Sequence, residues 1–349
     1  MNSKPLVAIT MGDPSGVGAE VIIKSIAALK AADWFSFVVI GDTEILKTTN
    51  ILLKTELQIE SVGDLSEIPQ FIGRVPVLDT GNFDPRLAAV GQLSAEAGRA
   101  SMEWVLKSGQ LCLSGAVDAV ATAPINKEAC RMAGYEDIGH MEVYQRLSRS
   151  KNVATMLVSG HLRVVHLTTH RSLRLACDYV TKDHVFEKII LTDTFFRDWG
   201  FPEPRIAVAA LNPHASDGGL IGHEENQEIA PAVDEARRYG ARVDGPIPAD
   251  TVFHQAIRGN YDVVIAMYHD QGHIPIKVYG FEESISVNLG LPFVRTSVDH
   301  GTAFDIAGKG VADPRSMIEA IGLAAALSSG RGLIGTGLSS ETVTTDTLS

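Results

Sequence analysis

Short apolar runs alternate with longer stretches of helical periodicity along most of this chain. Runs typical of buried strands lie at residues 6–11, 35–42, 116–124, 153–160, 162–170, 205–214, 261–270 and 293–298. Helical periodicity marks residues 19–32, 94–109, 183–200, 226–240 and 313–330. Strands that are apolar along most of their length are buried on both faces, as in sheets that carry helices on each side. The alternation therefore predicts an α/β fold built on a largely parallel sheet.

The bulk properties argue against several classes of partner. The chain has 349 residues, enough for two domains of ordinary size, and a formal net charge of −12 without a basic stripe. A nucleic-acid partner or an anionic membrane surface is therefore not expected. The three cysteines lie far apart, which favours reduced thiols, and the apolar segment before Gly12 is too short for a signal peptide or a membrane span. We expect a cytoplasmic protein.

Histidines follow three of the predicted strands. His170, His214 and His269 each stand where an apolar run gives way to polar residues. Because ligands of α/β proteins bind beyond the carboxyl ends of strands, these imidazoles are expected to converge on one divalent metal, whether zinc, cobalt, manganese, nickel or magnesium. Asp270 is suited to orient a ligand or hold a proton. The alternatives are that each histidine is a satisfied polar residue, or that His166 replaces His170.

Two glycine-rich segments have the character of binding turns. Residues 11–22 (MGDPSGVGAEVI) are typical of a strand, a turn and a helix, but they lack the GxGxxG fingerprint of a dinucleotide fold. Their glycines allow close approach of another chain segment or of a ligand, and a simple tight turn is an equal alternative. Residues 299–314 form a long segment in which His300, Lys309 and exposed backbone amides are predicted to hold the adenosine part of a nucleotide.

Several of these segments together resemble a known enzyme family. HGTAFDIAGKGVADP resembles the adenosine-binding loop of the isocitrate and isopropylmalate dehydrogenase fold, which binds NAD without GxGxxG. GDPSGVG, TAPINK, LTTH, LNPHA, PADT, MYHDQG and GLPFVRTSVDHGTA resemble the 4-hydroxythreonine-4-phosphate dehydrogenase family and its paralogues. The matches run in order from about residue 6 to residue 325, nearly the whole chain, and MYHDQG with RTSVDHGTA is highly specific.

The resemblance implies an isocitrate/isopropylmalate dehydrogenase-like fold with two α/β domains and a cleft between them. Residues 1–125 with 285–335 are expected to form a discontinuous nucleotide-binding domain, residues 126–284 a metal, substrate and dimerisation domain, and residues 336–349 a flexible tail. NAD is the expected cofactor, with NADP as the alternative. The residues expected to bind it are His300, Gly301, Thr302, Asp305, Gly308 and Lys309. The resemblance also implies a homodimer with the active site at its interface.

The resemblance further assigns roles to individual residues. It implies metal ligands at His170, His214 and His269, catalytic roles for Asp250, Asp270 and Lys277, and substrate contacts at His140, Met141, Lys277, Ser286, Asn288 and Arg295. The expected reaction is a metal-dependent, NAD-linked oxidation of a phosphorylated 3-hydroxy acid of the 4-phosphohydroxy-L-threonine type, with decarboxylation of the keto acid. Lys277 and Arg295 are expected to bind a carboxylate or phosphate of this substrate.

Two substrate segments depart from the family pattern. Met141 stands where the family has threonine, and Ser286 and Asn288 stand where it has asparagine and threonine. Since a site built on hydrogen bonds rejects substrates that leave them unpaired, the substrate stays open. The paralogues act on 4-phospho-D-threonate, 4-phospho-D-erythronate or a dihydrodiol carboxylate, and HDQGHIPIK with His273 resembles them more closely. The rival hypotheses are a metal-dependent hydrolase or lyase without NAD, and a non-catalytic binding protein.

Overall fold

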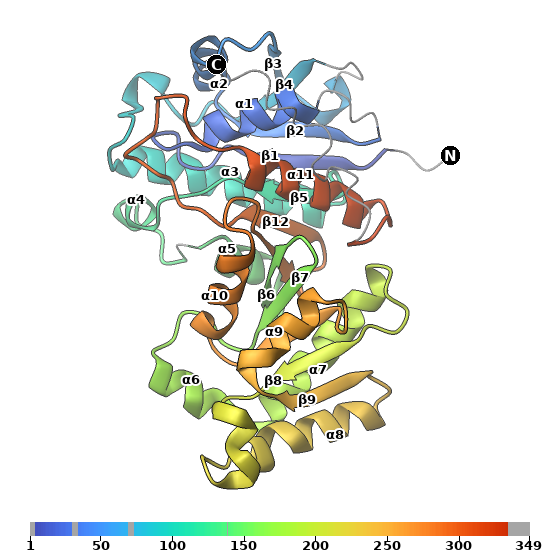
Figure 1. Cartoon of the computed structure of the whole chain (residues 1–349). Coiled ribbons are helices and arrows are strands. Elements are labelled where there is room, and N and C mark those ends of the chain that lie inside the picture. The colour runs from blue at the N-terminus through green and yellow to red at the C-terminus, as the bar shows by residue number, and fades with distance from the viewer. Residues whose placement is uncertain (1–3, 30–33, 69–72, 138, 334–349) are drawn as a thin grey trace. The chain divides into compact units, whose positions relative to one another are not determined.

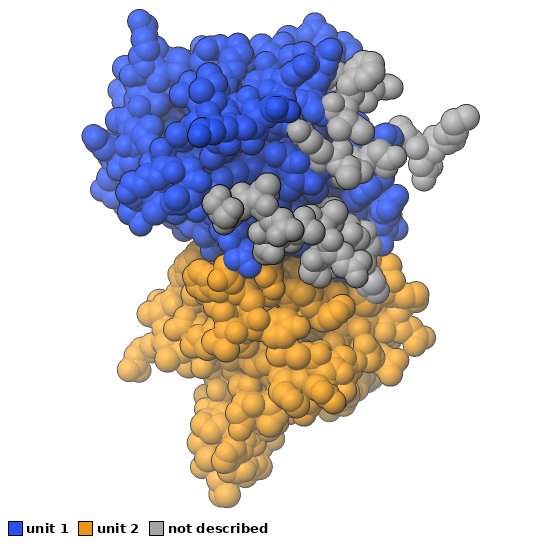
Figure 2. All heavy atoms as spheres, turned by 45° about the horizontal axis from the view of Figure 1, so that its top comes forward, with its two compact units in different colours: residues 1–150, 291–349 blue, residues 151–290 orange. Residues whose placement is uncertain are grey.

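The chain divides into two compact units, described here from a computed structural model of residues 4–29, 34–68, 73–137 and 139–333. Unit 1 comprises Met1–Ser150 and Leu291–Ser349, and unit 2 comprises Lys151–Gly290 (Figures 1 and 2). Unit 2 is thus a single insertion into the sequence of unit 1. The expected flexible tail at residues 336–349 lies outside the described residues.

Unit 1 is built on a wholly parallel sheet with the strand order β3-β4-β2-β1-β5-β12. Its strands are β1 (Leu6–Thr10), β2 (Ser36–Gly41), β3 (Gln58–Val62), β4 (Arg74–Asp79), β5 (Ala119–Thr122) and β12 (Val294–Val298). Its α-helices are α1 (Gly18–Ala28), α2 (Thr43–Leu52), α3 (Ala95–Leu113), α4 (Lys127–Met132), α5 (His140–Ser148) and α11 (Arg315–Ser328). The short 3-10 helices are η2 (Leu65–Glu67) and η3 (Pro85–Leu87). Both α3 and α11 pack on β1 and β5, which buries the centre of the sheet.

Unit 2 has a mixed sheet with the strand order β11-β6-β7-β10-β8-β9. Its strands are β6 (Ala154–Ser159), β7 (Leu162–His166), β8 (Ile206–Ala209), β9 (Val243–Ile247), β10 (Val263–Ala266) and β11 (Ile285–Leu289). Its helices are α6 (Leu173–Tyr179), α7 (Lys182–Asp198), η4 (Pro213–Gly219), η5 (Glu225–Ile229), α8 (Ala230–Arg238), α9 (Ala249–Ile257) and α10 (His269–Tyr279). The ladders β11–β6 and β6–β7 are antiparallel, whereas β7, β10, β8 and β9 pair in parallel.

The predicted α/β class is confirmed, and each of the eight predicted apolar runs contains a strand. Every residue of β5, β8 and β10 is buried, as two-sided cover by helices requires. Four strands escaped the sequence pattern. β3 and β9 are edge strands with exposed residues, β4 contains Pro76, and β11 alternates apolar residues with Ser286 and Asn288. Within the described residues, no helix is long and apolar enough to cross a membrane.

The division into units differs from the expected domain boundaries at two segments. Residues 126–150 contain α4 and α5, which pack on α3 and therefore belong to unit 1. Residues 285–290 contain β11, which pairs with β6 and therefore belongs to unit 2. Helix packing and ladder pairing set these boundaries, whereas the binding roles expected for the two domains stay predictions.

Candidate functional site

The three candidate metal-binding histidines follow three neighbouring parallel strands of unit 2. β10 pairs with β7 on one side and with β8 on the other. The chain leaves these strands at Ala266, His166 and Ala209, and His269, His170 and His214 follow within five residues of each end. The expectation that strand ends gather these histidines on one edge of the sheet therefore agrees with the topology. The apolar runs themselves are longer than the strands, because each continues into the loop that carries the histidine.

His170 and His269 lie close together beside a pocket. Their ring centroids are 6.0 Å apart. The pocket has a volume of about 320 Å³ and is lined by Thr169, His170, Arg171, Leu173, Ala176, Tyr268, His269 and Asp270. His269 opens α10, and its Nδ1 lies 2.6 Å from Asp270 Oδ1. A carboxylate on Nδ1 fixes the ring and leaves Nε2 directed to another partner, as in many histidine metal ligands.

His214 lies in η4, in a segment of unusual backbone. His214, Ala215, Ser216 and Asp217 all have positive φ angles, between 45° and 65°. His214 is exposed, and its Nδ1 lies 3.3 Å from Asp217 Oδ2, which again leaves Nε2 for another partner. Among the residues that the structure describes, no group of three or more His, Cys, Asp or Glu side chains is arranged to hold a metal. The donor chemistry of the three imidazoles fits a divalent ion, but only His170 and His269 are brought together.

A row of imidazoles extends from this pocket into the interior of unit 2. The His273 ring stacks on the His269 ring at 3.6 Å between centroids and 13° between planes. The buried His166 ring lies 4.6 Å beyond His273, and His273 Nδ1 lies 3.0 Å from the His269 carbonyl oxygen. Burial lowers the pKa of His166 to about 3, so this ring is neutral in the folded protein. Sequence reasoning missed the stack, although the i, i+4 spacing of His269 and His273 on one helix predicts it.

The remaining candidate residues of unit 2 lie on three elements. Lys277 is on α10 with its Nζ 4.8 Å from the centroid of the Phe281 ring, and Asp250 is exposed in the first turn of α9. Ser286 and Asn288 alternate along β11 and therefore share one face of that strand. Asn288 is buried and Ser286 is half-buried.

A second group of candidate residues lies in unit 1. Arg295 on β12 is buried, and its Nη2 donates a hydrogen bond of 2.7 Å to Thr122 Oγ1. His140 begins α5, Met141 follows it, and neither is fully exposed. Burial and the positive charges of Arg295 and Lys127 hold the pKa of His140 well below its usual value. Burial lowers the pKa of Arg295 to about 10, so its guanidinium stays charged at neutral pH. This electropositive corner suits an anionic ligand.

The predicted nucleotide loop folds back on itself. His300 Nδ1 lies 2.9 Å from the Gly301 carbonyl oxygen, and Lys309 Nζ donates to the Asp305 carbonyl oxygen at 2.7 Å. Thr302 is buried, whereas Gly301, Asp305, Gly308 and Lys309 are exposed. The exposed side of the loop therefore carries four of the six residues expected to bind the cofactor.

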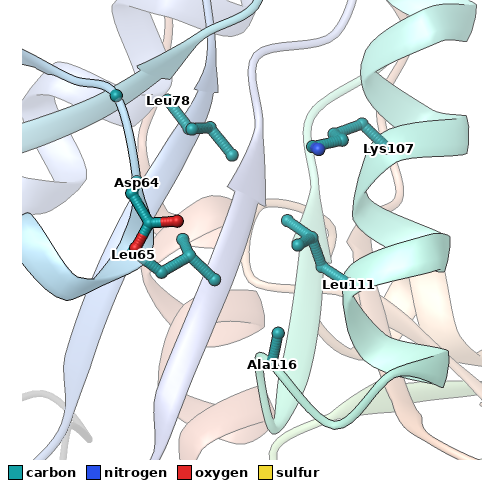
Figure 3. A pocket seen from close by; sticks show the side chains of 7 residues that line it. Asp64, Leu65, Leu78, Lys107, Leu111 and Ala116 are labelled. Carbon is teal, nitrogen blue, oxygen red and sulfur yellow. The ribbon is translucent and has the colours of Figure 1, made fainter.

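A second pocket lies in unit 1 and contains no predicted site residue. It has a volume of about 350 Å³ and is lined by Gly63, Asp64, Leu65, Leu78, Lys107, Leu111 and Ala116. Figure 3 shows Lys107 of α3 pointing into it, opposite Asp64 and Leu65. Its mixed lining includes no histidine, so it lacks the imidazoles found beside His269.

Comparison with known proteins identifies the family that this chain resembles. The family model described as "Pyridoxal phosphate biosynthetic protein PdxA" matches residues 33–324. A Fusobacterium nucleatum protein, provisionally named D-threonate 4-phosphate dehydrogenase, is 44% identical over 319 residues, which cover 91% of this chain and 96% of the relative.

Solved structures agree with this match. The crystal structure of 4-hydroxythreonine-4-phosphate dehydrogenase from Klebsiella pneumoniae superposes with a TM-score of 0.86 at 42% identity, covering 94% of this chain and 99% of that one. A 4-hydroxythreonine-4-phosphate dehydrogenase from Burkholderia phymatum gives a TM-score of 0.82 at 44% identity, covering 93% and 99%. The family model matches most of this chain, and relatives of 42–44% identity cover more than nine tenths of it. The chain therefore belongs to the PdxA family.

Proposed function

We propose that the chain is a metal-dependent, NAD-linked dehydrogenase that oxidises D-threonate 4-phosphate at its 3-hydroxyl and promotes loss of the carboxylate. Family membership and the names of the relatives support an oxidoreductase acting on a phosphorylated hydroxy acid. The observation that carries the proposal is the pairing of His170 and His269 beside Asp270, in a pocket at the carboxyl ends of β7 and β10.

The histidines are the proposed metal ligands. His170, His214 and His269 would hold a divalent ion through their imidazole nitrogens. Lewis acidity at the substrate hydroxyl is the chemistry that such an ion supplies. Asp270 keeps the His269 ring in one tautomer and orientation through the contact at Nδ1.

Charged side chains of this chain would bind the substrate and move its protons. Arg295 and His140 supply hydrogen-bond donors for the phosphate, and a guanidinium is suited to bind phosphate by two parallel bonds. Lys277 on α10 is a donor for the carboxylate or the proton source for the carbon that loses carbon dioxide. Asp250 is the alternative proton carrier, since it is exposed at the start of α9.

The nicotinamide cofactor would bind through the loop at residues 299–314. Gly301 is exposed with open space beside its Cα, and Lys309 adds a positive charge. Hydride acceptance is the chemistry that NAD supplies. We further propose that the active enzyme is a homodimer with its sites at the interface.

The choice of D-threonate 4-phosphate rests on the relatives' names and on the substrate positions. Met141 offers only a weak sulfur acceptor where a threonine hydroxyl would both donate and accept. Losing a hydrogen bond to a charged group costs about 1.5–3 kcal/mol, roughly ten- to a hundredfold in specificity. D-threonate 4-phosphate carries a hydroxyl at C2 where 4-phosphohydroxy-L-threonine carries an amine, so the loss of a polar partner at residue 141 should count against the amino acid.

The test measures NAD reduction on a panel of four acids: D-threonate 4-phosphate, D-erythronate 4-phosphate, 4-phosphohydroxy-L-threonine and a dihydrodiol carboxylate. We expect the highest kcat/KM on D-threonate 4-phosphate, loss of turnover on chelation, and recovery on adding back a divalent metal. The double variant Met141→Thr with Ser286→Asn should improve use of 4-phosphohydroxy-L-threonine. Highest efficiency of the unmodified enzyme on 4-phosphohydroxy-L-threonine overturns the choice of substrate, and turnover of any panel member without NAD supports a hydrolase or lyase instead.

A further inference from the structure

The glycine turn at residues 12–18 packs against the chain's own backbone. A Cβ at Gly12 would lie 2.4 Å from the Pro124 carbonyl oxygen, and one at Gly18 would lie 2.1 Å from the Met11 carbonyl oxygen. At Gly16 a Cβ would lie 2.9 Å from the Thr302 carbonyl oxygen. Contacts this short exclude any side chain, so the glycines are explained by close approach of three chain segments. One of those segments is the predicted nucleotide loop.

The helix that follows this turn is bonded to the same loop by two charged side chains. Glu20 Oε1 accepts a hydrogen bond of 2.6 Å from the Gly308 backbone N–H. Lys24, one turn further along α1, donates to the Gly310 carbonyl oxygen at 2.8 Å and to the Ala312 carbonyl oxygen at 2.6 Å. The backbone N–H of Val17 completes the set with a bond of 3.0 Å to the Thr302 carbonyl oxygen.

These bonds add to the turns within the loop, where Ile306 N–H and Ala307 N–H both donate to the Ala303 carbonyl oxygen at 3.1 Å. Ala303, Gly308 and Gly310 have φ angles of 44°, 74° and 69°, and glycine there leaves the unfolded segment many alternative conformations. Glu20 is buried, and burial lowers the pKa of Lys24 against the opposing effects of Glu20 and Asp313. The buried Glu20 and the half-buried Lys24 thus bond backbone atoms in place of water, which is favourable only if those atoms are held in place.

We propose that Glu20 and Lys24 are positioning residues that preform the loop at residues 299–314 for a dinucleotide. The inference rests on the proposed function, because it takes this loop as the cofactor site. With the loop tied down from 302 to 312, its exposed residues Asp305 and Lys309 meet the ligand without a further ordering cost. A preformed site binds more tightly than one that must order on binding.

The experiment compares Lys24→Met and Lys24→Arg with the unmodified enzyme. Amide hydrogen exchange of residues 303–312 is measured without cofactor, NAD affinity by calorimetry, and KM and kcat for NAD by steady-state kinetics. Lys24→Met should speed exchange in this segment and raise the Kd for NAD about ten- to a hundredfold, the range for losing bonds to a charged group. The kcat at saturating NAD should change by less than about threefold, and Lys24→Arg should restore part of the affinity, since a guanidinium can still donate to both carbonyls.

Lys47→Met is the matched control, since Lys47 is exposed on α2 and pairs only with Glu44 at 2.8 Å among its described contacts. If Lys24→Met does not fold, as judged by circular dichroism, Lys24→Gln keeps one donor and repeats the test. If the unmodified enzyme binds no NAD, the proposed function is overturned. Amide hydrogen exchange of the Lys24 variants would in that case still show whether α1 orders the loop. Normal NAD binding together with unchanged exchange and affinity in the Lys24 variants overturns the positioning role alone.

Discussion

At the scale of single residues, the interior of each unit contains ionisable groups whose burial changes their chemistry. In unit 1, Asp13 is buried in the glycine turn, where its Oδ1 accepts a hydrogen bond of 2.8 Å from the Ser15 N–H. Its Oδ2 has no hydrogen-bond partner within the described part of the chain. Burial raises the pKa of Asp13 to about 6, in spite of hydrogen bonds from the backbone of Ser15 and Asn126.

Asp13→Asn should therefore stabilise the protein at high pH more than at low pH. The folded pKa lies above the unfolded value of about 3.9, so the folded state favours the protonated carboxyl. Its contribution to stability is fully present below about pH 4 and is lost as the pH rises through 6. Asparagine avoids that loss, which should amount to about 1–3 kcal/mol at pH 8 relative to pH 4. Urea denaturation of both proteins at the two pH values measures it, and an equal difference at both would refute the assignment.

At the scale of elements, the loop after β8 is held at its start mainly by Glu225, with a further hydrogen bond of 2.7 Å from Asn212 Nδ2 to Glu224 Oε2. The buried Glu225 accepts hydrogen bonds through Oε1 from the backbone N–H groups of Leu211 and Asn212, at 2.8 and 2.7 Å. Its Oε2 accepts from Asn212 Nδ2 at 2.9 Å. The left-handed segment that carries His214 follows directly, so Glu225 determines where that segment begins.

Glu225→Ala should destabilise unit 2 and weaken metal binding. Removing the carboxylate leaves the half-buried N–H groups of Leu211 and Asn212 without this acceptor, at a cost of about 1–3 kcal/mol. With the loop start released, His214 would reach the other histidines less often, and cobalt(II) affinity followed by visible absorption should fall at least tenfold. Glu235→Ala is the control, because Glu235 makes a surface ion pair with Lys182 and should change stability by under about 0.5 kcal/mol. Unchanged cobalt affinity in a destabilised Glu225→Ala would separate this loop from the metal site.

At the scale of the whole molecule, the expected homodimer has a candidate surface on α10 and the turn after it. Ile274, Val278 and Phe281 are exposed by 60%, 83% and 61%. Large apolar side chains gathered on one helix face mark an interaction surface more often than an ordinary solvated one. The same helix carries His269 and Lys277, so a partner bound there would lie next to the candidate site.

Val278→Glu should shift the protein from dimer to monomer, because a charge at the centre of an apolar contact is desolvated without a partner. Sedimentation velocity over a range of concentrations measures the shift, and turnover should fall with the dimer fraction. Ile51→Glu on α2 is the control, since Ile51 is 77% exposed on a helix with no predicted role. A Val278→Glu protein that remains dimeric would place the interface elsewhere, and a fully active monomer would end the proposal of an interfacial site.

The local sequence pattern determined the fold class, the buried strands and the positions of the histidines after them, because these depend on residues that are neighbours in the sequence. Continuous apolar runs located the buried strands β1, β5, β8 and β10, because burial selects residue type position by position. The positions of His170, His214 and His269 after such runs were predictable for the same reason. The edge strands β3 and β9 were not, since exposed residues and the Gly-Pro pair in β9 dilute the pattern.

Only the tertiary structure decided the strand order and the role of the glycine turn, because both depend on contacts between residues that are far apart in the sequence. The order β7-β10-β8 places the strand that precedes His269 between the strands that precede the other two histidines, although whole helices separate the three strands along the chain. The glycine turn at residues 12–18 was equally consistent with a ligand or a tight turn until Thr302, 286 residues after Gly16, was found against it. Hydrogen-bond ladders and backbone contacts of this kind join residues that are far apart in the sequence. The sequence around one partner does not predict the other, because the free energy of the pairing depends on the whole folded chain.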